Sequence, residues 1–200
     1  MFRKGSFLTT PTMAEGQMMT QKWQIAFKLL DFNKDGVLSV ADKDACKEAF
    51  KAIFKPDEAQ TGNMMQELDA FWGKSLFLDG PEDWSRSLTL DDFIASRRSL
   101  FSSDRGIIHE IVKGATTHLV KAAKVTGKRT FSFDEFNNLH MAAGQTDENF
   151  IKTIYDTIGA DADGNIPAEK IEEFYTELTM GSDQEKHDRY LSAFAAAGFV

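Results

Sequence analysis

The chain has 200 residues, of which 42% are hydrophobic and 27% charged, so it is long enough to bury an apolar core without disulfides. Its net charge of −8 excludes nucleic acid as the main partner, because phosphate binding needs a basic surface. Cys46 is the single cysteine, so no intrachain disulfide can form, and a reducing compartment such as the cytoplasm is expected.

Residues 1–16 contain no long apolar stretch and are expected to form a flexible N-terminal extension rather than a secretory signal. No later apolar run approaches the length of a membrane span. From residue 17 onward the apolar residues recur with helical spacing nearly throughout. Four short β-like segments interrupt that spacing: VLSV, SLTLDDF, TFSFDEF and NIPAEK.

Each β-like segment lies between two helical patterns and has an apolar residue at its centre: Leu38, Leu88, Phe131 and Ile166. Helix, loop, short strand and helix, repeated four times, predict an all-α fold of four EF-hand helix-loop-helix units in two pairs. We expect one pair in residues 17–102 and the other, followed by a C-terminal tail, in residues 103–200. Short two-stranded ribbons should join the paired loops, with Leu38 facing Leu88 and Phe131 facing Ile166.

The first loop, DFNKDGVLSVAD at residues 31–42, has the spacing of a divalent-cation site. Such a loop supplies oxygens from positions 1, 3, 5, 7, 9 and 12, with Gly at position 6 for a sharp turn. Gly36 stands at position 6, and Val37 offers its backbone carbonyl at position 7. The predicted metal ligands are Asp31, Asn33, Asp35, Val37, Ser39 and Asp42.

Asp42 is the one departure from the pattern, which usually ends in Glu. Glu can offer both carboxylate oxygens to Ca²⁺, which prefers six to eight ligands, whereas Mg²⁺ takes six. The shorter Asp42 favours a lower ligand number, so Mg²⁺ is expected to compete with Ca²⁺ at this site.

The three later loops fill the ligand positions poorly. The departures are Pro81 and Arg86 in the second loop (81–92), Lys124 and Lys128 in the third (124–135), and Gly159 and Lys170 in the fourth (159–170). Cationic side chains at ligand positions repel a divalent ion. The fourth loop keeps Asp161, Asp163 and Gly164, so weak binding there stays open. One strong site, in the first loop, is predicted.

The stretch KWQIAFKLLDFNKDGVLSVAD, the degenerate second loop and the segment GADADGNIPAEK together resemble the invertebrate sarcoplasmic calcium-binding proteins of the molluscan type. More distantly, the chain is similar to the coelenterazine-binding protein and photoprotein fold. The resemblance covers residues 20–200. It implies a compact helical fold whose halves pack together, and calcium and magnesium buffering in the cytosol. The lysines of the third loop depart from the family, whose members commonly keep that loop functional.

The expected function is a cytoplasmic Ca²⁺ and Mg²⁺ binder that acts as a buffer or carrier. Two alternatives stay open: a calcium sensor that grips a partner helix, and a carrier of a small apolar ligand such as an imidazopyrazinone luciferin. The sequence shows no set of nucleophile, base and oxyanion donors, so catalysis is not predicted. Divalent cations are the expected partners, and no particular protein partner is indicated.

Overall fold

Helices dominate the computed structural model of the chain, which describes residues 13–124 and 127–196. Within those ranges the helices are α1 Met13–Leu30, α2 Val40–Phe54, α3 Glu58–Phe77, α4 Leu90–Ser103, α5 Arg105–Ala123, α6 Phe133–Ala142, α7 Glu148–Ile158, α8 Ala168–Met180 and α9 Gln184–Ala196. The strands are β1 Val37–Leu38, β2 Leu88–Thr89, β3 Thr130–Phe131 and β4 Ile166–Pro167. The predicted all-α fold class is confirmed. None of the described helices is long and apolar enough to cross a membrane.

Two antiparallel ribbons join the loops in pairs. β1 pairs with β2 and places Leu38 opposite Leu88, while β3 pairs with β4 and places Phe131 opposite Ile166. Both predicted pairings are therefore confirmed. Leu38, Phe131 and Ile166 are fully buried, and burial of each such side chain contributes about 1.5–3 kcal/mol. This burial holds the paired loops together through protein groups alone.

The helices that follow the first three loops begin with the same capping box. The side chain of the N-cap residue accepts a hydrogen bond from the first turn of the helix, and the carboxylate of the third helical residue accepts one from the N-cap backbone. The pairs are Ser39 with Asp42, Thr89 with Asp92, and Ser132 with Glu135. In the fourth loop, Pro167 stands at the N-cap and makes no side-chain cap. The carboxylate at position 12 is thus held by its own helix start in three of the four loops.

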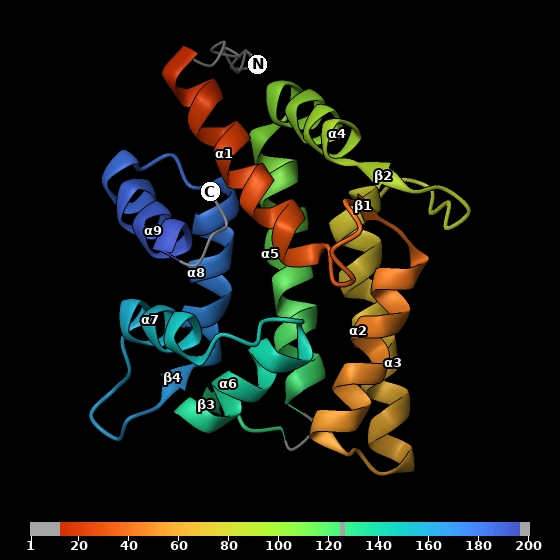
Figure 1. Cartoon of the computed structure of the whole chain (residues 1–200), viewed down its shortest axis with the longest axis vertical. Coiled ribbons are helices and arrows are strands. Elements are labelled where there is room, and N and C mark those ends of the chain that lie inside the picture. The colour runs from red at the N-terminus through yellow and green to blue at the C-terminus, as the bar shows by residue number, and fades with distance from the viewer. Residues whose placement is uncertain (1–12, 125–126, 197–200) are drawn as a thin grey trace, which may run out of the picture.

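Helix α5 lies in the middle of the molecule, where it packs against α3 on one side and α8 on the other (Figure 1). Helix α1 also contacts α8, and α2 contacts α6, so the two predicted EF-hand pairs pack against each other. A single apolar cluster takes in buried residues from the whole described chain, including Trp72 and Phe93 of the first pair and Ile108 and Phe174 of the second. The two pairs therefore form one packed body.

The N-terminal boundary differs from the sequence expectation. Helix α1 begins at Met13, so residues 13–16 are helical rather than part of an extension. Glu15, in the first turn, pairs with Arg105 at the start of α5 at 2.7 Å. The rest of the expected extension, residues 1–12, lies outside the described residues.

Helix α9 occupies part of the segment for which the sequence predicts a C-terminal tail. Its Tyr190 ring packs against Phe174 of α8 with centroids 4.7 Å apart, and Phe194 packs against Phe150 of α7 at 5.1 Å. The helical signal is weak in the sequence because few apolar residues stand among many polar ones. Contact with α7 and α8 supplies the stabilisation that the local sequence lacks.

We expect the protein to be fully folded without divalent ions, because the ribbons, capping boxes and core are made by protein groups alone. The ion-free and Ca²⁺-loaded forms should give the same far-ultraviolet circular dichroism and the same small-angle scattering radius. A large gain of helical signal on Ca²⁺ addition would contradict this expectation.

Candidate metal centre

The first loop turns sharply between α1 and α2. The backbone N–H of Asp31 still donates to the Phe27 carbonyl at 2.9 Å, so the loop starts directly from the last turn of α1. Lys34 and Gly36 adopt positive φ angles of 59° and 86°. A Cβ at Gly36 would meet no atom within 4 Å, so its backbone angle, rather than space, is what favours glycine there.

The polar side chains in the first half of this loop are turned toward one another. The carboxylate of Asp31 accepts hydrogen bonds from the backbone N–H groups of Asp35 at 3.2 Å and Gly36 at 3.1 Å. Asn33 accepts from the Asp35 N–H at 3.0 Å and donates its amide N–H to the Asp35 carboxylate at 2.8 Å. The other Asp35 oxygen accepts from the Val37 N–H at 3.0 Å. Positions 1, 3 and 5 therefore face the inside of the turn.

Asp42 closes the loop from the opposite end, and its side chain is fully buried. One carboxylate oxygen accepts from the Ser39 N–H at 2.8 Å and the Ser39 hydroxyl at 3.4 Å. The other oxygen accepts from the Asn33 N–H at 3.2 Å, which lies across the loop. Asp42 thus joins the start of α2 to the first half of the loop.

The donors gathered in this loop fit a hard divalent cation. They are carboxylate, amide, carbonyl and hydroxyl oxygens, which Ca²⁺ and Mg²⁺ prefer, and no thiol or imidazole is among them. No group of three or more His, Cys, Asp or Glu side chains stands ready to hold a metal within the described ranges. The physical reason is that Asp31, Asp35 and Asp42 direct their oxygens to loop N–H groups. To bind an ion, these oxygens would have to turn inward and leave the hydrogen bonds that already fix the turn.

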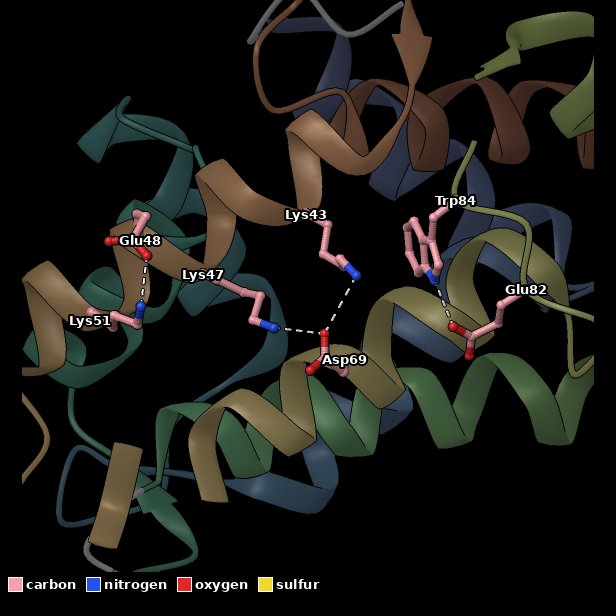
Figure 2. A network of polar contacts seen from close by, with 7 residues as sticks. All are labelled: Lys43, Lys47, Glu48, Lys51, Asp69, Glu82 and Trp84. Carbon is pink, nitrogen blue, oxygen red and sulfur yellow. Dashed lines mark hydrogen bonds and ion pairs between the residues drawn. The ribbon is translucent and has the colours of Figure 1, made fainter. Parts of the chain in front are cut away.

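The second loop is held by side-chain contacts that involve no metal ligand set. Asp83 accepts from the Ser85 hydroxyl at 2.6 Å and the Ser85 N–H at 3.2 Å, and these hydrogen bonds lower the pKa of Asp83. Trp84 donates its indole N–H to Glu82 at 2.7 Å, while the ammonium of Lys43 lies 3.8 Å from the centre of the Trp84 ring (Figure 2). The loop is therefore fixed against α2.

In the third loop an ammonium group joins position 1 to position 12. Lys124 Nζ lies 2.8 Å from a carboxylate oxygen of Glu135 and 4.1 Å from the centre of the Phe131 ring. Burial raises the pKa of Glu135, but hydrogen bonds from Lys124 and Ser132 outweigh that effect, so its pKa lies below the usual value. Thr126, at position 3, lies outside the described residues.

The fourth loop is closed in a related way. Lys170 Nζ, from position 12, donates to the Gly159 carbonyl at position 1 at 3.1 Å. Asp161 accepts from the backbone N–H groups of Asp163 at 3.0 Å and Asn165 at 2.9 Å. The sequence predicts only that two lysines repel a metal from the third loop and that the fourth loop lacks ligands at both of its ends. The structure adds that in each of them a lysine ammonium connects the two ends of the loop.

No protein-family model matches the chain. A curated relative, a sarcoplasmic calcium-binding protein from Mizuhopecten yessoensis, is 22% identical over 177 residues, which cover 88% of this chain and 97% of the relative.

Several solved structures share the fold. The Ca-loaded apo form of coelenterazine-binding protein from Renilla muelleri has a TM-score of 0.67 at 14% identity, and the match covers 88% of this chain and 96% of that one. The structure of n-aequorin has a TM-score of 0.68 at 13% identity over 94% of this chain and 98% of its own. A calcium-binding protein from Streptomyces coelicolor gives 0.62 at 15% identity over 82% and 99%. The EF-hand fold and both resemblances stated from the sequence are confirmed.

Substitution of Asp31 with Ala should remove nearly all Ca²⁺ binding, because Asp31 supplies the carboxylate that begins the loop and meets the turn at Gly36. The matched control is Asp161→Ala, which removes a carboxylate from the fourth loop and should leave the stoichiometry unchanged. Calorimetric titration of both variants measures this. Tight binding of two or more Ca²⁺ ions by the Asp31 variant would show that the degenerate loops are functional.

Substitution of Lys170 with Glu should create a weak second site, because it replaces the ammonium at position 12 with a carboxylate facing Asp161 and Asp163. In an Asp31→Ala background we expect a dissociation constant on the order of 10⁻⁴–10⁻³ M for Ca²⁺. Lys170→Met is the control, since it removes the charge without adding an oxygen ligand. Equal Ca²⁺ binding by the Met and Glu variants would mean that repulsion alone keeps this loop from binding Ca²⁺.

Proposed function

We propose that this chain is a cytoplasmic divalent-cation binding protein that acts as a buffer or carrier and is not an enzyme. Its strong site is the loop 31–42, where Ca²⁺ is bound and Mg²⁺ competes. The observation that supports this most directly is the convergence of four side chains, Asp31, Asn33, Asp35 and Asp42, on one closed turn. The Val37 carbonyl and Ser39 complete the ligand set. The proteins that the chain resembles are calcium-binding proteins and photoproteins, which supports a binding role.

The ion preference follows from the reach of the residue at position 12. In the third loop, one carboxylate oxygen of Glu135 accepts a hydrogen bond from the Ser132 N–H at 2.9 Å. The other oxygen accepts from the ammonium of Lys124, the cation at position 1. Asp42 is one methylene shorter and gives its oxygens to the Ser39 and Asn33 N–H groups. An ion in the first loop therefore competes with the capping box for Asp42, which favours one oxygen from Asp42 rather than two.

A buffer fits the surroundings of α2 better than a sensor does. A sensor opens when the helix that follows the loop swings away. Here Lys47 and Lys43 of α2 lie 2.7 Å and 3.7 Å from Asp69 of α3, as Figure 2 shows. Such exposed pairs contribute at most about 1 kcal/mol each. The fully buried Phe50 on the same helix contributes more, and together these contacts oppose the opening of α2.

A luciferin carrier is less well supported. The largely apolar cavity inside the helical shell measures about 140 Å³. Sites for drug-sized ligands usually measure about 300–1,000 Å³. A luciferin with several rings would need the helices to separate, so the cation-binding function is the one that we favour.

Substitution of Asp42 with Glu should raise the ratio of Ca²⁺ to Mg²⁺ affinity about tenfold, equivalent to about 1.4 kcal/mol. The longer side chain can keep its hydrogen bond to the Ser39 N–H and still offer an oxygen to the larger ion, just as Glu135 accepts from the Ser132 N–H and offers its other oxygen to the Lys124 ammonium. Calorimetric titration with Ca²⁺, alone and in millimolar Mg²⁺, counts the sites and ranks the ions in both proteins.

The matched control is Asp92→Glu, at position 12 of the second loop, which should change neither the stoichiometry nor the affinity ratio. An unchanged or lower ratio in the Asp42→Glu variant would show that loop rigidity, not side-chain length, sets the ion preference. Absence of any divalent-ion binding by the unmodified protein would overturn the proposed function itself.

A further inference from the structure

The cavity lined by α1, α2, α3, α4, α5, α6 and α8 has a charge imbalance. Its lining includes two cations, Lys74 and Arg97, and no carboxylate, in a chain whose net charge is −8. Lys74 lies 2.6 Å from Asp79 and is therefore paired. Arg97 is 4% exposed and forms no ion pair with any carboxylate in the described ranges. A buried charge without an opposite charge is costly, so its surroundings need explanation.

Part of the Arg97 guanidinium has a structural role. It donates to the carbonyl of Ser75, near the C-terminal end of α3, and to the Phe93 carbonyl at 3.3 Å. The Ser75 carbonyl is one of the last four in its helix, which lack helical partners and attract cations. The guanidinium also stacks on the Phe93 ring, with Cζ 3.1 Å from its centre. These contacts leave the positive charge uncompensated, because all of the partners are neutral.

Lys22 provides a comparison within the same molecule. It is equally buried and donates to the Glu177 carbonyl at 2.8 Å, near the end of α8. Burial lowers the pKa of Lys22 to about 8, and the carboxylates of Glu177 and Asp183 act in the opposite direction. Burial likewise lowers the pKa of Arg97, but no carboxylate counters it among the described residues. An Arg side chain is not deprotonated in proteins, so the charge remains.

Most other polar groups of the cavity wall are donors or are already satisfied, and the Gln145 amide is the exception. Trp23 and Trp72 line the cavity, and their indole N–H groups are buried without a hydrogen-bond acceptor in the described part of the chain. The Trp72 indole also lies near the Cys46 thiol. Burial raises the pKa of that thiol to about 12, and Trp72 lowers it slightly, but the contact does not reach hydrogen-bond geometry.

His140 and Tyr175 satisfy each other across the cavity wall. The Tyr175 hydroxyl donates to His140 Nε2, and His140 Nδ1 donates to the Phe136 carbonyl at 2.8 Å. Burial lowers the pKa of His140 to about 4, so the ring is neutral at pH 7 and Nε2 can accept. Apart from the Gln145 amide, which offers both a donor and an acceptor, the unpaired polar groups of the wall in the described part of the chain are N–H donors, and these favour a ligand that brings acceptors.

We propose that this cavity binds a small aromatic carboxylate of one ring, with its carboxylate at Arg97 and its ring among the aromatic side chains. The aromatic residues of the lining are Trp23, Phe32, Phe71, Trp72, Phe93 and Tyr175. The volume of about 140 Å³ suits this size, since a cavity of about 150 Å³ in another protein binds benzene. A guanidinium and a carboxylate match in charge and in planar geometry. The proposal is independent of cation binding in the first loop.

Three probes of the same size and different charge test the head group: benzoate, benzyl alcohol and benzylamine. Ligand-observed NMR and calorimetry on the full chain, with and without Ca²⁺, measure their binding. We expect benzoate to bind, benzyl alcohol to bind roughly tenfold more weakly or worse, and benzylamine not to bind. Equal binding of benzoate and benzyl alcohol, or no binding of benzoate, would overturn the proposal.

Two variants locate the site. Arg97→Met should reduce benzoate binding to the level of benzyl alcohol, whereas Arg98→Met, at the exposed neighbouring position, should change neither. Ala115→Leu should weaken binding of both probes because Ala115 lines the cavity and the added atoms fill it. Undiminished benzoate binding by the Ala115 variant would place the probe elsewhere and overturn the assignment. The probe series in the unmodified protein and the Ala115 variant decide the question even if the Arg97 variant does not fold.

Discussion

Closure of the loop by a contact across its two halves is a constraint that the first, third and fourth EF-hands of this chain meet with protein groups. The two helices of a hand leave the loop in different directions, so some contact must join its ends. A metal ion is one such contact. In the third and fourth loops a lysine ammonium connects these ends instead, from position 1 to Glu135 and from position 12 to the Gly159 carbonyl.

The second hand, which lacks the predicted ligand set, supports the first. Ribbon pairing transmits the fixed shape of the second loop to the first, because Leu38 lies opposite Leu88 and is fully buried. The second loop is in turn held against α2 by the contact between Lys43 and Trp84. We propose that a site built on such a frame binds an ion with movement of the ligand side chains and little change in the helices. That property suits buffering, in which the useful event is binding itself rather than a change of shape.

The same helices line the partly open cavity. Its walls come from helices of both EF-hand pairs, so the cavity exists only because the pairs pack into one body around α5. Arg97 and two indole N–H groups bring a positive charge and unpaired donors into this interior in the described part of the chain, although the net charge of the protein is −8. The proposed ion binding in the first loop and the proposed anion recognition in the cavity are compatible within one chain, because they use separate groups.

The sequence by itself determined the repeat and the ribbon register, and it pointed to one metal loop. Apolar spacing and ligand spacing are local properties of the sequence, and a Gly at position 36 indicates a positive φ angle there. Tertiary structure decided the rest. Helix α9 forms because Phe194 and Tyr190 meet rings on α7 and α8, which sequence spacing cannot show. From the sequence, Lys124 and Lys170 are only cations at ligand positions of the third and fourth loops. The fold shows that each ammonium contacts an oxygen at the other end of its loop. In the sequence, Arg97 is one more charged helical residue. Only the packing of α4 against α1 and α5 shows that its charge is buried without a carboxylate among the described residues, because burial depends on contacts far apart in the chain.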